Sequence, residues 1–323
     1  MTAARRSDAE LPPLDYSIPP WPGRRVSVGA AELFVRDTPS EGGEPALCVH
    51  GLGGASTNWT DFAGLLAPWL AIESIDLPGF GRSGPAPDRD YSIAAHTQTV
   101  IRYLDQSGRG PVHLFGNSMG GVISILIAAQ RPDLVRTLTL ISPAVPDLRP
   151  RRLGTDPLLA LALVPGTAGL IRRRISRYPA QLRARSVIKL CFADPSRVPP
   201  NRLAEATEEI EHRDGLGWST DALLRSLRGL VGTYLRPGHR GLWARMATIT
   251  APTLVVWGDR DRLVDVAMAP RVARTISGAR LMVLDNVGHV AQLEEPEPTA
   301  RAALALIEDT RRADESSHEG VAP

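Results

Sequence analysis

Along most of the chain, short apolar runs alternate with longer segments that mix apolar and polar residues. The runs PALCVHG, AIESIDLP, PVHLFGN and VRTLTLIS suit buried strands. Between and after them, residues 58–70, 92–108 and 118–132 have patterns that we interpret as helices. Strands that alternate with helices predict a mostly parallel, doubly wound α/β sheet with helices on both faces.

This alternation stops at about residue 143 and returns at about residue 249. The interval is helical in pattern, punctuated by prolines and rich in arginine. After it, APTLVVWG and ARLMVLDN predict two more strands, and VAMAPRVARTIS and EPTARAALALIEDTRR predict two more helices. We therefore predict an α/β core, residues 23–142 plus 249–312, into which a helical cap, residues 143–248, is inserted.

The two ends of the chain have different patterns. Residues 1–22 contain several prolines and predict an extended lead-in, and RRVSVGAAELFVRD then predicts an antiparallel hairpin. Residues 313–323 are polar, which predicts a disordered tail.

Composition excludes several classes of protein. The chain is 43% apolar and 22% charged, as in an ordinary globular protein, and its net charge of +2 is too small to indicate nucleic-acid binding. Cys48 and Cys191 lie far apart in apolar runs, so we expect two buried thiols and neither a disulfide nor a metal site. No apolar run has membrane-spanning length, and charges and prolines occupy the N-terminus where a signal peptide would be apolar. We expect a cytoplasmic protein; the oligomeric state stays open.

Residues 115–121, FGNSMGG, place a serine between glycines directly after an apolar strand. Gly116-Asn117-Ser118-Met119-Gly120 fits G-x-S-x-G at a strand-to-helix junction, the pattern of a nucleophile elbow. Side chains at the glycine positions would clash with such a strained turn, and the following helix would stabilise negative charge near Ser118. A glycine-rich loop without chemistry is the alternative interpretation.

A nucleophilic serine needs a base and a carboxylate that orients the base. In this architecture the order along the chain is serine, acid, histidine. His289 alone follows a late strand, and Asp261 lies in the loop after TLVVWG, far enough from Gly258 to reach it. We expect Asp259 to bond backbone amides and Asp265 to begin the next helix.

The loop HGLGG, residues 50–54, follows the strand PALCV and can approach a substrate closely. We expect the backbone amides of Leu52 and Met119 to stabilise a developing oxyanion. His50 competes as a base, but we interpret it as a local hydrogen-bonding residue that shapes the loop.

The chain resembles the α/β-hydrolase fold family, in its serine hydrolase branch with a helical cap. The resemblance covers about residues 24–310, and the matching motifs are HGLGG (50–54), DLPGFGRSG (76–84), GNSMGG (116–121), WGDRD (257–261) and VGH (287–289). It implies catalysis by Ser118, His289 and Asp261 through an acyl-enzyme, without cofactor or metal. The turn that begins at Asp76 resembles a structural feature of the family.

Carboxylic ester hydrolysis, with a hydrophobic or lipid-like acyl group, is the activity that we predict. Carbon–carbon bond hydrolases of meta-cleavage products are an alternative, because they share GNSMGG and an NW-x-x-F stretch, here Asn58, Trp59 and Phe62. They differ in having a tryptophan where this chain has Val290, and an extra proline in the oxyanion loop. A non-catalytic binding protein with the same fold is a second alternative.

The cap is expected to select the substrate. Its runs LLALALVPGTAGLI and VIKLCF offer apolar surface that could cover an acyl chain. Its arginines could hold an anionic group or contact lipid phosphates. The simpler interpretation is that the arginines face water, which we favour, while the role of the apolar face stays open.

Overall fold

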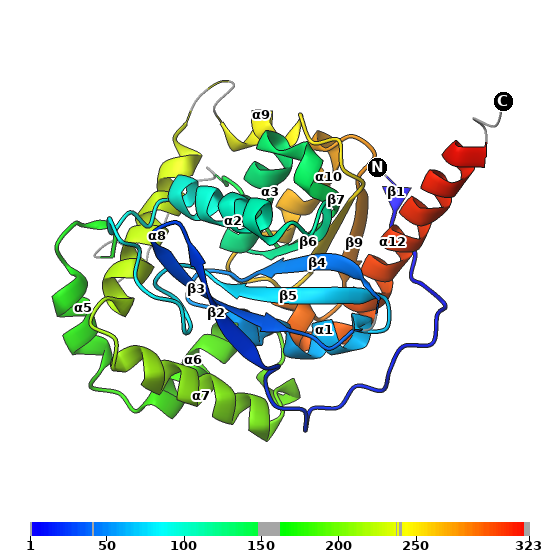
Figure 1. The fold of residues 1–323 in the computed structure, drawn as a ribbon. Helices are drawn as coiled ribbons and strands as arrows, with labels where there is room; N and C mark the ends of the chain where they lie inside the picture. Colours follow the sequence, from blue (N-terminus) through cyan, green and yellow to red (C-terminus); the bar gives the residue numbers. More distant parts are fainter. Residues whose placement is uncertain (1, 41, 148–161, 237, 239–240, 320–323) are drawn as a thin grey trace.

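A computed structural model describes residues 2–40, 42–147, 162–236, 238 and 241–319 (Figure 1). Nine strands form one sheet in the order β1-β9-β8-β7-β6-β4-β5-β3-β2. The strands are β1 (Thr2–Ala3), β2 (Gly23–Val28), β3 (Ala31–Asp37), β4 (Glu44–Val49), β5 (Leu70–Asp76), β6 (Val112–Asn117), β7 (Val135–Ile141), β8 (Thr253–Gly258) and β9 (Arg280–Leu284). The pairing is parallel from β5 through to β1, and antiparallel only where β3 meets β2 and β5. The predicted fold class and the hairpin are confirmed.

Helices cover both faces of this sheet, because side chains along a strand alternate between its faces. Leu47 and Val49 of β4 join one apolar cluster, while Ala46 and Cys48 join the other. The first cluster includes α2 and α3, and the second includes α1 and α12. The core helices are α1 (Thr60–Leu66), α2 (Ile93–Ser107), α3 (Met119–Gln130), α10 (Ala269–Thr275), α11 (Ala291–Glu294) and α12 (Pro296–Glu319).

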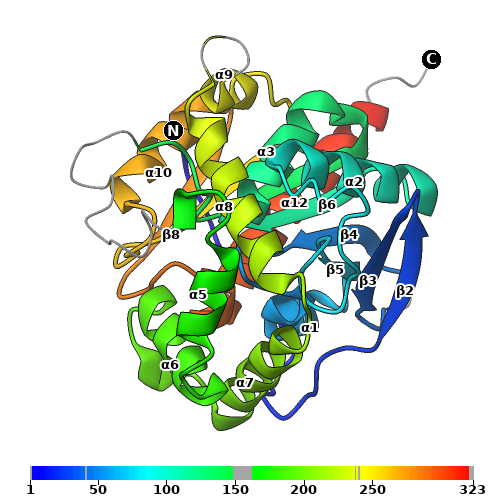
Figure 2. The same cartoon turned by 90° about the vertical axis from the view of Figure 1, so that its left-hand side faces the viewer.

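Helices also fill the described part of the predicted cap. They are α5 (Ala168–Ile175), α6 (Ala180–Cys191), α7 (Pro200–Asp214), α8 (Ser219–Tyr234) and α9 (Leu242–Met246). Helices α5 to α8 lie together on the side that faces the viewer in Figure 2. The partly buried guanidinium of Arg202 in α7 donates to both carboxylate oxygens of Asp61 in α1, at 2.6 and 3.1 Å, which fastens the cap to the core.

The proposed division at residues 143 and 248 stays a prediction, because residues 148–161 lie outside the described residues. They include the beginning of the apolar run LLALALVPGTAGLI. At the other boundary, Leu242 and Met246 of α9 pack into the core cluster that contains α3.

The prediction of a disordered tail at residues 313–323 is wrong for its described part, because α12 continues to Glu319. Polar side chains of this extension make ordered contacts: Arg136 of β7 pairs with Asp314 at 2.8 Å, and Ser316 Oγ donates to Arg312 O at 2.8 Å. At the other end of the chain, the lead-in is extended but not isolated, since β1 pairs with β9. No described helix combines the length and the apolar character that a bilayer crossing requires.

Candidate active site

Ser118 occupies a strained turn between β6 and α3, with φ 55° and ψ −116°. A side chain is rarely found in this region of backbone conformation. The neighbouring glycines make the turn sterically feasible. A Cβ at Gly116 would lie 2.4 Å from Ser124 Oγ, and one at Gly120 would lie 2.2 Å from Val49 O. The predicted clash at these two glycines is confirmed.

The strained backbone of Ser118 is fixed by hydrogen bonds to the next strand. Its N–H donates to Ile141 O at 3.0 Å, and its carbonyl accepts from Ala144 N at 3.0 Å. Ser118 stands at the N-cap position of α3, but its side chain makes no capping hydrogen bond. The partly exposed hydroxyl is therefore not used to complete the helix.

His289 and Asp261 form the predicted histidine–carboxylate pair. Asp261 Oδ2 lies 2.8 Å from His289 Nδ1, and both side chains are buried. The other oxygen, Oδ1, accepts from the backbone N–H groups of Leu263 and Val264 at 2.8 and 2.9 Å. Because a carboxylate only accepts, this contact favours the imidazole tautomer that carries its proton on Nδ1 and leaves Nε2 as the acceptor.

Asn117 joins the histidine loop to the strand that carries the serine. Its Nδ2 donates to His289 O and to Ile141 O, each at 3.1 Å. Among the described residues no hydrogen bond links Ser118 Oγ to the His289 ring, so their direct contact stays a prediction. Such bonds are often long in proteins without substrate and shorten in the reacting complex.

The two other aspartates of this region have the structural roles that we predicted. Asp259 Oδ1 accepts from Val287 N at 3.3 Å, which ties the loop after β8 to the histidine loop. Asp265 accepts from Ala267 N at 2.9 Å and begins a short 3₁₀ helix, Val266–Met268. Asp261 alone of the three contacts the imidazole.

The loop HGLGG lies directly against the elbow. A Cβ added to Gly51 would be 3.1 Å from the Cβ of Ser118. Met119 is the first residue of α3, so its N–H has no partner within the helix. The assignment of the Leu52 and Met119 amides as oxyanion donors stays a prediction, and this proximity supports it.

His50 shapes that loop, as predicted. Its Nε2 accepts from Leu77 N at 3.1 Å, and its Nδ1 lies 2.7 Å from Gly51 O. Burial lowers the pKa of His50. Nearby, Asp76 accepts from Ser56 N at 2.5 Å and from Arg82 N at 2.9 Å, which confirms that its turn is structural.

Glu294 is a buried carboxylate that sequence reasoning missed. Its Oε2 accepts from Gly288 N at 2.7 Å, next to the histidine, and from Ala193 N in the cap at 3.0 Å. Its Oε1 accepts from Asp194 N at 2.8 Å. One side chain thus holds both the histidine loop and the cap segment after α6. An acid five residues after His289 is the only signal in the sequence, and it does not reveal these partners.

The end of α6 touches the histidine loop directly. His289 N donates to Cys191 O at 2.6 Å, and a Cβ at Gly288 would lie 2.2 Å from the same oxygen. Cys191 is half-buried, not fully buried as predicted, and burial raises the pKa of its thiol to about 12, which disfavours the thiolate at neutral pH. Cys48 is fully buried, as predicted. No group of three His, Cys, Asp or Glu side chains in the described part of the chain is arranged to hold a metal ion.

A second cap helix reaches the HGLGG loop. Arg213 of α7 donates from Nη1 to Gly53 O at 2.7 Å, a contact that sequence reasoning also missed among so many arginines. Its neighbour Glu209 is largely buried, and burial raises the pKa of Glu209 to about 7.

Residues 45–296 match the family model described as the alpha/beta hydrolase fold. The dihydrolipoyllysine-residue acetyltransferase component of the acetoin cleaving system from Pseudomonas putida is 29% identical over 88% of this chain and 69% of its own length. Monoacylglycerol lipase abhd6-B from Xenopus laevis is 26% identical over 84% of this chain and 78% of its own. A 2-hydroxy-6-oxononadienedioate/2-hydroxy-6-oxononatrienedioate hydrolase from Pseudomonas putida is 27% identical over 83% and 89%.

A solved structure agrees with this architecture. An esterase from Thermogutta terrifontis superposes with a TM-score of 0.69 over 90% of this chain and 99% of its own. Its sequence identity is 23%, at which the likeness establishes the fold alone.

Proposed function

The chain belongs to the alpha/beta hydrolase fold family, and on that premise we propose that it is a serine hydrolase that cleaves carboxylic esters with a hydrophobic acyl group. The observation that carries the proposal is the buried His289–Asp261 pair, 2.8 Å apart, on the loops after β9 and β8. Asn117 bonds this loop to the strand end beside Ser118. Ser118, Asp261 and His289 thus follow the carboxyl ends of three strands of one sheet, which is where open α/β sheets have their binding sites.

In the proposed reaction, Ser118 Oγ attacks the ester carbonyl carbon while His289 Nε2 takes its proton. His289 then gives that proton to the departing alkoxide, leaving an acyl-enzyme on Ser118. Water, deprotonated by His289, attacks the acyl carbonyl, and the proton returns to Ser118. Asp261 holds the imidazole in one tautomer and stabilises the imidazolium that forms in both half-reactions.

The tetrahedral intermediates carry negative charge on the former carbonyl oxygen. We assign the N–H groups of Leu52 and Met119 to it, because the glycine loop and the start of α3 lie beside Ser118. Donors of this kind contribute roughly 100- to 1,000-fold each to the rate.

Two kinds of support favour an ester with an apolar acyl group. One relative is a monoacylglycerol lipase. The cap also places an apolar side chain beside the HGLGG loop, since a Cβ at Gly53 would lie 3.4 Å from Leu223 Cδ1 of α8.

Carbon–carbon bond hydrolysis is the second candidate. A relative of similar sequence identity is named as a hydrolase of 2-hydroxy-6-oxononadienedioate and 2-hydroxy-6-oxononatrienedioate. The shared NW-x-x-F stretch adds nothing to it, because packing explains these residues. Trp59 and Phe62 are fully buried with ring centroids 5.6 Å apart, and Phe62 packs edge-to-face against Phe115 with centroids 5.2 Å apart. Asn58 Oδ1 accepts from Ala55 N at 3.1 Å.

Labelling with a fluorophosphonate tests whether the protein is a serine hydrolase at all. We expect stoichiometric labelling of the wild type and none of Ser118→Ala. A folded wild-type protein that does not react would favour the alternative of a non-catalytic binding protein.

Parallel assays then separate the two hydrolytic candidates. We expect p-nitrophenyl esters of medium or long chains to turn over faster than acetate, and a dienoate ring-cleavage product to turn over slowly. Fast turnover of the dienoate alone would overturn ester hydrolysis in favour of carbon–carbon cleavage.

A further inference from the structure

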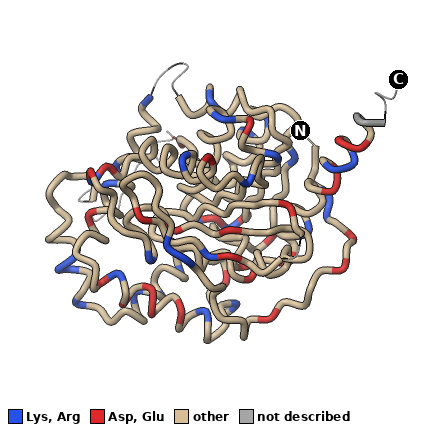
Figure 3. Tube along the Cα trace, in the orientation of Figure 1, with Lys and Arg blue, Asp and Glu red and all other residues tan. Residues whose placement is uncertain are grey.

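The outer surface of cap helices α5 and α6 combines positive charge with exposed apolar side chains. Residues 162–193 contain no Asp or Glu, although the whole chain has nearly as many acidic as basic residues, 35 against 37. The cations of this segment are Arg172, Arg173, Arg174, Arg177, Arg183, Arg185 and Lys189. Figure 3 shows the basic positions along these helices, at the left of the molecule.

Large apolar side chains are exposed on the same segment. Seven of the ten exposed large hydrophobic residues in the described part of the chain lie between residues 163 and 190. These seven are Leu163, Val164, Leu170, Tyr178, Leu182, Val187 and Leu190. Soluble monomers seldom expose large apolar patches without a binding role, so the gathering of these residues on one segment calls for an explanation.

Helical geometry places both kinds of side chain on one outward face. In α6, Ala184 is buried toward the molecule, whereas Leu182, Arg185, Lys189 and Leu190 are exposed. Their spacing of three, seven and eight residues from Leu182 keeps them on the same side of the helix.

Helix α5 also exposes both basic and apolar side chains. Its Ile171 packs with Leu224 of α8, which leaves Leu170 and the three consecutive arginines from Arg172 exposed. Figures 1 and 2 show both helices at the outside of the cap.

Carboxylates neutralise little of this charge. Arg183 pairs with Asp214 of α7, but the other six cations of the segment make no ion pair within the described residues. A polynucleotide would neutralise the cations but would leave the leucines in water. An anionic bilayer satisfies both, because its head groups attract arginine and lysine while its acyl boundary accepts leucine and tyrosine. We propose that the α5–α6 surface binds peripherally to the anionic surface of a lipid bilayer.

This surface is directly connected to the candidate active site. The last residue of α6, Cys191, accepts the hydrogen bond from His289 N. A protein docked through α5 and α6 would hold its catalytic loop near molecules that partition into the bilayer. This use of the surface rests on the proposed ester hydrolysis, whereas the docking itself does not.

Co-sedimentation with vesicles tests the proposal. We expect the wild type to bind vesicles of equal phosphatidylglycerol and phosphatidylcholine, to bind phosphatidylcholine alone weakly, and to dissociate in high salt. Changing Arg172, Arg173 and Arg174 together to Gln should weaken binding to the anionic vesicles roughly 100-fold, since each cation near such a surface contributes about 1 kcal/mol. The matched control changes Arg6, Arg102 and Arg274 to Gln, which removes the same net charge from other exposed positions and should leave binding nearly unchanged.

A second pair of changes, Leu182→Ser and Leu190→Ser, tests the apolar component and should also weaken binding. Absence of wild-type binding, or an equal loss in the control triple variant, would overturn the proposal. Binding that depends on the arginines but not on the leucines would indicate a soluble polyanion and would overturn it too. Fluorophosphonate labelling of each variant in solution shows whether its active site is intact. If the wild type bound vesicles but did not react with the fluorophosphonate, that result would refute the hydrolase assignment and still support the docking surface.

Discussion

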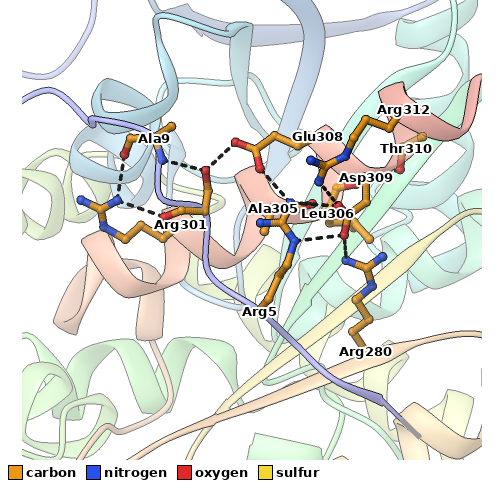
Figure 4. A network of polar contacts seen from close by, with 11 residues as sticks. Arg5, Ala9, Arg280, Arg301, Ala305, Leu306, Glu308, Asp309, Thr310 and Arg312 are labelled. Carbon is orange, nitrogen blue, oxygen red and sulfur yellow. Dashed lines mark hydrogen bonds and ion pairs between the residues drawn. The ribbon is translucent and has the colours of Figure 1, made fainter. Parts of the chain in front are cut away.

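Two polar regions of this molecule are built in opposite ways. Where the lead-in meets α12, exposed charges pair with one another: Arg5 lies 2.9 Å from Glu308 and 2.8 Å from Asp309, and Arg280 and Arg312 contact the same aspartate (Figure 4). At the carboxyl edge of the sheet, the carboxylates are buried and accept mainly from backbone N–H groups. Asp261 accepts from two backbone N–H groups and contacts His289, while Glu294 accepts from three backbone N–H groups with Arg197 3.8 Å away.

The exposed ion pairs attach a chain end to the core, whereas the buried carboxylates position the loops of the candidate site. Exposed ion pairs contribute up to about 1 kcal/mol and are weakened by salt, so they can fasten a chain end without fixing atoms. Even there, hydrogen bonds from Arg5 hold the pKa of Asp309 well below its usual range. A buried carboxylate must have its oxygens satisfied, and that requirement fixes the loops that supply the N–H groups.

The largest effect is expected at the acid that orients the histidine. Asp261→Asn preserves shape but favours the wrong imidazole tautomer, so we expect kcat for ester hydrolysis to fall about 10,000-fold. The matched control is Asp259→Asn, which alters the contact to Val287 N and the ion pair with Arg260 at 3.4 Å and should cost far less. Steady-state kinetics of both variants check this, and an equal or larger loss in Asp259→Asn would reverse the assignment of the acid.

A smaller loss is expected at Glu294, which contacts no reacting atom. Glu294→Gln turns an amide N–H₂ toward backbone N–H groups, so we expect the histidine loop to shift and kcat to fall about 100-fold. KM should change little if Glu294 positions the base. Glu295→Gln is the matched control, because Glu295 is half-buried and pairs with Arg197 at 2.8 Å. Equal kcat in the two variants, or a rise in KM alone, would contradict a positioning role.

The sequence predicted the features that local sterics determine. The glycines around Ser118 and the strand ends follow from local turns, and Asp261 and Asp265 bond amides two or three residues away. Glu294 and Arg213 were missed because their partners, Ala193 and Gly53, lie 101 and 160 positions away. The continuation of α12 past residue 312 likewise brings Asp314 to Arg136, 178 positions away along the chain. Contacts of this kind become visible only when the chain is folded.

Glu209 differs both from the exposed ion pairs and from Asp261 and Glu294, because it is a largely buried carboxylate that lacks a full set of hydrogen-bond donors. Its Oε1 has no hydrogen-bond partner among the described residues, and the nearest cation, Arg213, lies 3.8 Å away. Burial, with a smaller contribution from Asp76, raises its pKa from 4.5 to about 7, against the opposing effect of Arg213, Arg82 and Arg36. The folded state thus binds this proton more tightly than the unfolded state, so the associated stability is complete below pH 4.5 and is lost as pH rises through 7.

Thermal unfolding at several pH values measures this contribution. We expect the free energy of unfolding of the wild type to fall by up to about 3 kcal/mol, relative to Glu209→Gln, between pH 4.5 and pH 8. Glu208→Gln is the control, since the Glu208 side chain is 71% exposed and should leave the pH dependence intact. Identical pH profiles for the wild type and Glu209→Gln would show that Glu209 stays ionised throughout.

The smallest effect is expected at the exposed network of Figure 4. Arg5→Gln removes the contacts to Glu308 and Asp309, whose side chains are 27% and 23% exposed beside an Arg5 that is 40% exposed. Because water and salt screen such pairs, we expect a loss of up to about 1 kcal/mol in the free energy of unfolding and no change in kcat.

In 1 M salt, where the screening length is about 3 Å, the difference from the wild type should shrink further. Chemical denaturation at low and high salt measures it, with Arg6→Gln as the control for loss of charge at the same end of the chain. A loss that persists in high salt, or a fall in kcat, would mean that the lead-in positions the catalytic edge and does more than attach the chain end.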